Sequence, residues 1–284
     1  MTEGKVTVPD IIQAKKDGRK LVMVTAYDYP FGLMADEAGV DMALVGDSLG
    51  MVVLGLDSTV AVTLDMMIHH IQAVVRGCKR SMVIGDMPFM SYNTGTRDAI
   101  VNAGRLMKEG GCDAVKLEGG VDFAPVVQAI VKAGIPVQGH VGLTPQTASA
   151  LGGFKMQGKD AAAARKIIDD ARALEAAGAF SIVAEAIPAP LGALIAKAVS
   201  VPVIGIGAGV DVDGQVLVTH DMVGLFDRFV PTFVKQYTKV RPTIIDAIKA
   251  YAKEVRESAF PTPGHSFGMS DAALAALTTD LKDS

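Results

Sequence analysis

The sequence predicts an α/β protein that folds as a (β/α)8 TIM barrel, and three observations support this fold class. First, eight short runs rich in Val and Ile recur along the chain. These runs are apolar throughout rather than alternating, as is typical of parallel strands that are buried on both faces. Second, segments with helical periodicity separate most of the runs. Third, the chain has 284 residues, a length that suits a single barrel domain.

The expected strands are short and dense in β-branched residues. They comprise residues 21–28, 42–49, 81–88, 114–120, 135–142, 181–188, 201–209 and 215–225. Helices are expected between strands and after the last one, and most of them stop just before a glycine. They comprise residues 63–76, 96–109, 160–177 and 233–257. The seventh connection, residues 210–214, is too short for a regular helix.

Two long loops and the chain ends complete the expected organisation. Residues 50–62 are expected to form a small hairpin, and residues 143–159 are long enough to close over a site. Residues 1–259 are predicted to form one barrel domain whose N-terminal segment caps the barrel floor. Residues 260–284 begin with a Pro/Gly linker, and we expect the short apolar helix that follows to pack on a neighbouring subunit.

Composition excludes several classes of protein. The 27 basic and 31 acidic residues give a net charge of −4, and no basic run exists to follow a phosphate backbone, so nucleic acid is not an expected partner. The polar N-terminus lacks the apolar stretch of a signal peptide. No uncharged apolar stretch reaches the length of about 18 residues that a membrane span needs. Two cysteines make neither a disulfide framework nor a zinc site. We therefore expect a cytoplasmic protein with no membrane partner.

Two carboxylates follow Gly at the ends of neighbouring strands. The segments ALVGDSLGM (43–51) and MVIGDMPFM (82–90) place Asp47 and Asp86 at equivalent positions. Because the C-terminal ends of barrel strands share one mouth, these side chains are expected to lie together. Paired carboxylates are suitable ligands for Mg²⁺. The alternative is that each Asp caps the helix that follows it.

Other ionisable residues are expected at the same mouth. Lys116 and Glu118 are two apart on one strand and so share a face, where Lys116 offers a positive charge to a substrate carboxylate or enolate. The alternative is a structural ion pair. Glu185 lies in an apolar run, where partial desolvation is expected to raise its pKa toward that of a general base, unless it is a satisfied buried Glu. His140 either donates a hydrogen bond to substrate or pins a loop.

Several motifs together resemble the ketopantoate hydroxymethyltransferase family (3-methyl-2-oxobutanoate hydroxymethyltransferase). The matching stretches lie between about residues 24 and 226, and they are VTAYDYPFG, VGDSLGM, GDMPFMSY, VKLEGG, GHVGLTPQ, AEAIPAP, IGIGAG and HDMVGLF. The resemblance implies a barrel of the phosphoenolpyruvate/pyruvate type. It also implies Mg²⁺, a 2-oxo acid substrate, a folate co-substrate, and a homo-oligomer that is typically a decamer built as a pentamer of dimers.

The resemblance also implies a role for each motif residue. Asp47 and Asp86 resemble the metal ligands of the family, with Glu118 completing the metal site, and Glu185 resembles the proton acceptor. The substrate contacts are expected to be Asp47, Ser48, Asp86 and Lys116.

The implied reaction belongs to pantothenate and coenzyme A biosynthesis. A hydroxymethyl group passes from 5,10-methylenetetrahydrofolate to 3-methyl-2-oxobutanoate, which gives 2-dehydropantoate and tetrahydrofolate. The Mg²⁺-chelated 2-oxo acid loses its C3 proton, and the resulting enolate attacks the one-carbon unit. Three alternatives are a Mg²⁺-dependent lyase or mutase on a similar barrel, a Schiff-base aldolase that uses Lys116, and a barrel that only binds a ligand or partner.

Overall fold

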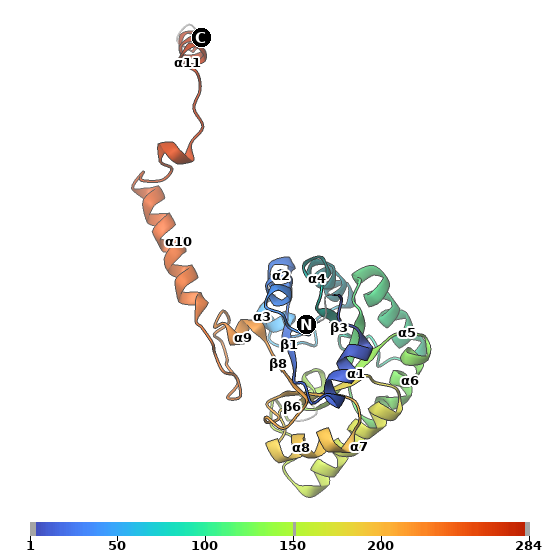
Figure 1. Cartoon of the computed structure of the whole chain (residues 1–284). Helices are drawn as coiled ribbons and strands as arrows, with labels where there is room; N and C mark the ends of the chain where they lie inside the picture. The colour runs from blue at the N-terminus through green and yellow to red at the C-terminus, as the bar shows by residue number, and fades with distance from the viewer. Residues whose placement is uncertain (1–3, 150–151, 282–284) are drawn as a thin grey trace.

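The computed structural model describes residues 4–149 and 152–281 and contains a closed barrel of parallel strands (Figure 1). The strands follow one another around the barrel in sequence order, and the last pairs with the first. They are β1 (Leu21–Thr25), β2 (Met42–Val45), β3 (Met82–Asp86), β4 (Ala114–Glu118), β5 (Val137–Gly142), β6 (Ser181–Glu185), β7 (Val203–Ile206) and β8 (Gly214–Leu217). The predicted (β/α)8 fold is therefore confirmed.

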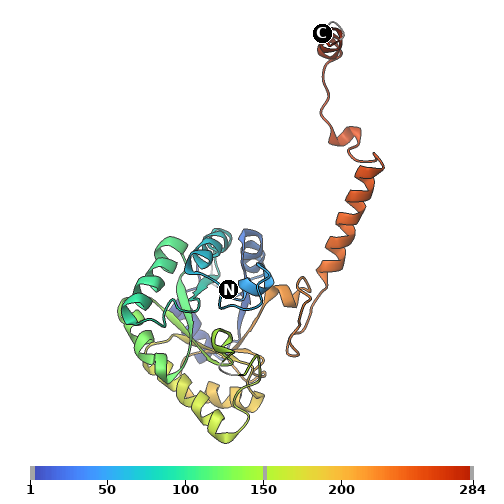
Figure 2. The same ribbon diagram turned by 180° about the vertical axis from the view of Figure 1, so that it is seen from behind.

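Helices surround the strands on the outside of the barrel (Figures 1 and 2). They are α2 (Tyr29–Glu37), α4 (Leu64–Gly77), α5 (Thr96–Arg105), α6 (Ala124–Lys132), α7 (Ala161–Ala176) and α8 (Ala189–Ala198). The expected helices at 63–76, 96–109 and 160–177 are present, although the second ends as a π-helix over Leu106–Gly110. Within the described residues β7 and β8 are joined without a helix, as their short connection predicts.

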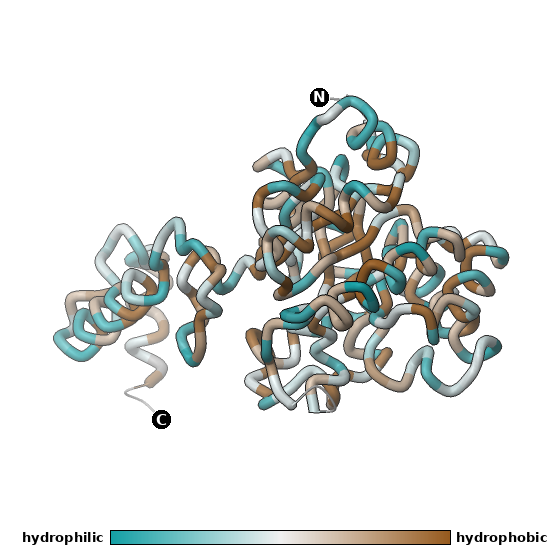
Figure 3. The backbone as a smooth tube through the Cα atoms, turned by 90° about the horizontal axis from the view of Figure 1, so that it is seen from below, coloured by the Kyte–Doolittle hydropathy of each residue, from teal (hydrophilic) through white to brown (hydrophobic). Residues whose placement is uncertain are grey.

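The core has two parts. One lies between the strands and the surrounding helices, where Val83 and Val115 pack with Ile71 of α4. The other fills the barrel itself and includes Met23 and Met82. Helix α1 (Val8–Lys16) lies before β1, and its buried face, Ile11 and Ala14, belongs to this inner cluster. Figure 3 shows the apolar segments running through the barrel body and hydrophilic segments in its outer turns.

Two local expectations are wrong. Residues 50–62 do not form a hairpin, because Ser48 is followed by the short helix α3 (Leu49–Val52) and then by turns. Leu56 N donates to Gly50 O and Val62 N donates to Thr59 O, so these backbone groups close turns instead of a strand ladder. The last strand also ends earlier than expected, at Leu217, and the short helix α9 (Thr219–Met222) follows it.

The C-terminal region leaves the barrel. The expected helix at 233–257 begins only at α10 (Val240–Arg256), because the preceding residues bond back to the α9 region, where Tyr237 N donates to Met222 O. Helix α10 and the final helix α11 (Asp271–Asp280) project away from the barrel in both views (Figures 1 and 2). The boundary at residues 259 and 260 remains a prediction. Among the described residues, no helix is long and apolar enough to cross a membrane.

A carboxylate at the end of α2 fixes the start of β3. Asp36 accepts hydrogen bonds from the backbone N–H groups of Lys79, Arg80 and Ser81, at 3.0, 2.9 and 2.6 Å. Burial alone would raise the pKa of Asp36, but these donors outweigh burial and lower the pKa below 3.8. The ionised form is therefore the one that stabilises the fold.

We predict that Asp36→Asn lowers the free energy of unfolding by about 1–3 kcal/mol at pH 7, measured by urea denaturation. Because the folded pKa is lowered, the difference from the wild type is present above pH 3.8 and shrinks as the pH falls below it. The exposed Asp122→Asn serves as the control and should leave stability unchanged. Equal stability of Asp36→Asn and wild type at pH 7 would contradict this role.

Candidate active site

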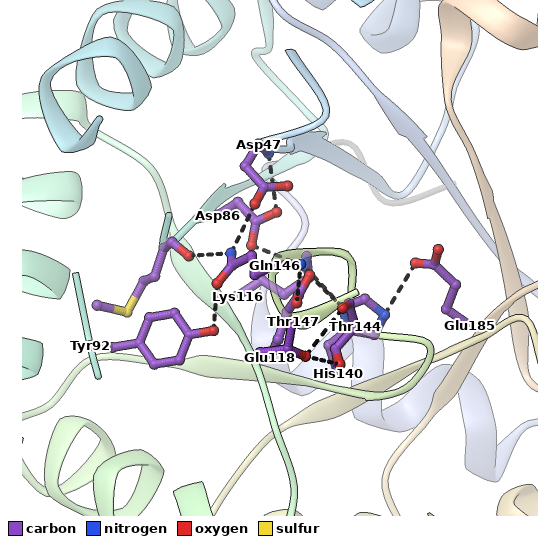
Figure 4. Close-up of polar contacts among 11 residues, drawn as sticks. Asp47, Asp86, Tyr92, Lys116, Glu118, His140, Thr144, Gln146, Thr147 and Glu185 are labelled. Carbon is purple, nitrogen blue, oxygen red and sulfur yellow. Dashed lines mark hydrogen bonds and ion pairs between the residues drawn. The ribbon is translucent and has the colours of Figure 1, made fainter. Parts of the chain in front are cut away.

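The polar residues expected at the strand ends gather at the C-terminal mouth of the barrel (Figure 4). Asp47 follows β2, Asp86 ends β3, and β4 carries Lys116 and Glu118. His140 lies on β5. These five side chains are almost completely buried. Glu185 at the end of β6 lies nearer the rim, and its side chain is 17% exposed.

A buried ion pair joins two neighbouring strands. Lys116 Nζ lies 2.9 Å from Asp86 Oδ1, and the other oxygen of Asp86 accepts a hydrogen bond from Asp47 N at 3.2 Å. Burial alone would lower the pKa of Lys116, but the negative charges of Asp86, Glu118 and Asp47 outweigh it and raise the pKa. A lysine held protonated in this way is a poor nucleophile, so the Schiff-base alternative is disfavoured.

The surroundings of Asp47 and Asp86 disfavour the ionised form of their carboxylates. Burial, with the charges of Asp86 and Glu118, raises the pKa of Asp47 well above its usual value. Burial also raises the pKa of Asp86, although Lys116 opposes this. Three carboxylates face one ammonium group in a dry site, so the cluster is short of positive charge. This imbalance is the electrostatic signature of a site that accepts a cation.

His140 lies between two carboxylates. Its Nδ1 lies 3.4 Å from Glu118 Oε1, and its Nε2 lies 3.2 Å from Glu185 Oε2. Burial and the charge of Lys116 lower the pKa of His140, but Glu118 and Glu185 outweigh them and raise it to about 9. The raised pKa favours the imidazolium form, which would add a second positive charge beside Lys116, whose Nζ lies 3.4 Å from His140 Nδ1.

The loop after β5 contributes a residue that sequence reasoning missed. Gln146 Nε2 donates to Asp47 Oδ2 at 2.8 Å and to Met87 O at 2.9 Å, and its Oε1 accepts from Tyr92 at 2.6 Å. The motif GHVGLTPQ contains this Gln, but nothing in the motif indicates a partner so distant in sequence. Ser48 lies at the edge of the cluster, where its hydroxyl bonds Tyr27 at 2.8 Å.

A glycine allows this loop to cross the end of β6. Gly142 has a φ of +95°, and a Cβ at this position would lie 2.3 Å from the carbonyl oxygen of Glu185. The next amide, Leu143 N, donates to that same carbonyl at 2.9 Å. The close approach is available only to glycine, and it directs the chain back over the mouth of the barrel.

The donor set fits Mg²⁺. Asp47 and Asp86 supply hard oxygen ligands, and the buried Asp86 Oδ1 lies in an ion pair 2.9 Å from Lys116 Nζ. Within the described part of the chain, no three His, Cys, Asp or Glu side chains converge closely enough to enclose a metal ion. Glu118 is thus a neighbour of the pair in this structure. Mg²⁺ usually takes only one or two carboxylates and fills its remaining positions with water or substrate oxygens.

Solved structures with the same architecture belong to barrel enzymes. A 2,3-dimethylmalate lyase of the PEP mutase/isocitrate lyase superfamily aligns with a TM-score of 0.59 and 15% identity, over 98% of both chains. A phosphonopyruvate hydrolase solved with oxalate and Mg²⁺ aligns with a TM-score of 0.58 and 12% identity, over 97% of this chain and 96% of that one. At these identities the likeness shows the fold alone.

Sequence comparison defines the family. The ketopantoate hydroxymethyltransferase family matches residues 5–263. The chain is 58% identical to a 3-methyl-2-oxobutanoate hydroxymethyltransferase of Heliobacterium modesticaldum, over 94% of this chain and 97% of the relative. It is 59% identical to one of Oleidesulfovibrio alaskensis, over 93% and 91%. The chain therefore belongs to the ketopantoate hydroxymethyltransferase family, and it is an enzyme that transfers a hydroxymethyl group, so the purely binding alternative is excluded.

We predict that the imidazole of His140 is half-protonated at a pH of about 9 in the protein without added metal, measured by ¹⁵N NMR. Glu185→Gln removes one of the two carboxylates that favour the cation, so it should shift this midpoint to lower pH. Glu37→Gln, an exposed position at the end of α2, should not shift it. A wild-type midpoint at or below 6.5 would show that the contacts of His140 do not favour its charged form.

Proposed function

We propose that the enzyme transfers the one-carbon unit of 5,10-methylenetetrahydrofolate to 3-methyl-2-oxobutanoate, giving 2-dehydropantoate and tetrahydrofolate, in pantothenate and coenzyme A biosynthesis. A cytoplasmic location is part of this proposal. The observation that carries it is the buried cluster of Asp47, Asp86, Glu118 and Lys116 at the barrel mouth, in a chain of this family. Such a cluster can bind a cation and an anionic substrate together.

The residues of the cluster have two roles, which are to hold Mg²⁺ and to contact the substrate. Asp47 and Asp86 would hold Mg²⁺, with Glu118 beside them, and Ser48 and Lys116 would contact the substrate. A bound Mg²⁺ supplies Lewis-acid chemistry, in that it draws electron density from the keto group of a 2-oxo acid. Lys116 is buried and protonated, so it offers a fixed positive charge for the substrate carboxylate or for negative charge that develops on the keto oxygen.

Glu185 is the proposed proton acceptor. Its place at the rim leaves part of the carboxylate open to a substrate that sits on the buried cluster. His140 Nε2 lies 3.2 Å from Glu185 Oε2, so the imidazole can hold the carboxylate in place at the rim. When Glu185 takes the C3 proton, the C–H electron pair moves into the substrate and forms its enolate.

The remaining bonds balance with one water molecule. The enolate carbon forms a bond to the methylene carbon, and both carbon–nitrogen bonds to the folate break. Each released nitrogen takes one proton, one of them the C3 proton returned by Glu185 and the other from the water. Water supplies the hydroxyl oxygen of 2-dehydropantoate. A lyase or mutase on the same type of barrel would share the carboxylate cluster, but the family match at more than half identity favours transfer.

We also propose that the protein is a homo-oligomer, with the decamer as the expected form, and α10 supports this. Ile244, Ile248, Tyr251 and Val255 form an apolar stripe along α10, and Ile248 is 61% exposed. On the barrel, Val22 of β1 points outward and is 49% exposed, where a (β/α)8 barrel usually carries a helix. An apolar stripe on a helix that projects from its own barrel is suited to packing on a second copy. Residues 260–281 continue from α10 away from the barrel (Figure 1).

The proton-transfer step predicts isotope exchange. With 3-methyl-2-oxobutanoate and Mg²⁺ in deuterated water, the wild type should exchange the C3 proton, measured by ¹H NMR, and a chelator should stop the exchange. Glu185→Gln should slow the exchange on the order of 10²- to 10⁴-fold, because the proton acceptor is lost, while the substrate still binds.

Glu37→Gln provides the matched control, since it makes the same change at an exposed position, and it should exchange at the wild-type rate. Undiminished exchange in Glu185→Gln would assign the base to another residue. No exchange in the wild type would contradict the proposed transfer mechanism itself.

The oligomer proposal predicts a change in mass. Ile248→Glu places a charge in the apolar stripe of α10, so it should lower the molar mass measured by light scattering while the barrel stays folded. Lys253→Glu introduces the same side chain on the opposite face of α10 and should keep the wild-type mass. If Ile248→Glu keeps the wild-type mass as well, α10 does not hold the copies together.

A further inference from the structure

One neutral side chain from the β5–α7 loop enters the carboxylate cluster (Figure 4). Gln146 lies in the 3-10 turn Pro145–Thr147 and is only 4% exposed. Asp47 Oδ2 and Met87 O are both acceptors, so the amide must turn its NH₂ group toward them. Both side-chain N–H groups are therefore used inside the site.

The backbone of the same residue bonds a second carboxylate. Gln146 N donates to Glu118 Oε2 at 3.0 Å, while its side chain holds Asp47. Asp47 follows β2 and Glu118 lies on β4, so a single residue connects two strand ends that flank Asp86. These two carboxylates repel each other, and the N–H donors fix each of them in one orientation.

Tyr92 supports the amide from the other side. Its hydroxyl donates to Gln146 Oε1 at 2.6 Å, and the tyrosine itself is buried. Every polar group of the Gln146 side chain thus has a partner, which favours a single orientation of the amide. The hydrogen bond of the Tyr92 hydroxyl is connected to Asp47 through the Gln146 amide.

We propose that Gln146 is a positioning residue that orients Asp47 and Glu118 for the divalent cation, an inference that rests on the proposed Mg²⁺ site. A neutral amide suits this task. It donates hydrogen bonds to the carboxylates but leaves their negative charge available, whereas a lysine at the same place would compete with the cation. Partners that orient metal ligands in this way typically change metal affinity about 10- to 100-fold when they are removed.

The test is the affinity of the full-length protein for Mn²⁺, followed by the electron paramagnetic resonance signal of free Mn²⁺. Gln146→Leu has a similar size but no donors, so it should weaken Mn²⁺ binding about 10- to 100-fold. Gln157→Leu is the matched control, because Gln157 lies on the same loop and, among the described residues, its side chain bonds only Lys155 O. This control should bind Mn²⁺ as the wild type does.

Tyr92→Phe separates positioning from a general effect on folding. It leaves Gln146 in place but removes the hydroxyl that orients the amide, so it should weaken Mn²⁺ binding less than Gln146→Leu does. The double variant should be no weaker than Gln146→Leu alone, because Tyr92 acts through Gln146. If Gln146→Leu does not fold, Tyr92→Phe alone carries the test.

The Mn²⁺ affinities separate a failure of the Gln146 role from a failure of the proposed metal site. Wild-type affinity in a folded Gln146→Leu, or in Tyr92→Phe if Gln146→Leu does not fold, contradicts this inference and leaves the metal site standing. A wild-type protein that does not bind Mn²⁺ contradicts the proposed metal site, and the inference falls with it.

Discussion

The site depends on one electrostatic constraint, namely the burial of several carboxylates together at the mouth of the barrel. Like charges in a dry environment repel, and burial raises the pKa values of Asp47 and Asp86 as a result. Lys116 and His140 supply positive charge, while backbone and amide N–H groups satisfy the remaining oxygens. The compensation is incomplete, and the residual negative charge supports the proposed cation site.

The barrel and the strand-end residues could be predicted because both have local signals. Parallel strands buried on both faces require continuous apolar runs, so all eight strands are visible in the sequence. A charged residue at the end of such a run is conspicuous, and the fold then requires it to lie at the mouth. Asp47, Asp86, Lys116, Glu118 and Glu185 are brought together for this reason alone.

Features set by long-range contacts had no such signal. Gln146 reaches Asp47 across 99 positions in sequence, and its loop could have adopted many conformations. The hairpin expected at 50–62 fails because its backbone forms a short helix and turns, with Val52 and Val62 packed on the core. The amphipathic pattern of α10 predicts a helix but does not say which surface covers its stripe, since a helix packed on its own barrel would have the same sequence.

A crystal structure grown with Mg²⁺ and 3-methyl-2-oxobutanoate is the most direct test of this account. It should show the ion bound to oxygens of Asp47 and Asp86, with the substrate against Lys116 and its C3 atom facing Glu185. An ion bound elsewhere, or the two aspartates turned apart to cap their neighbouring helices, would contradict the proposed site and the catalysis that depends on it.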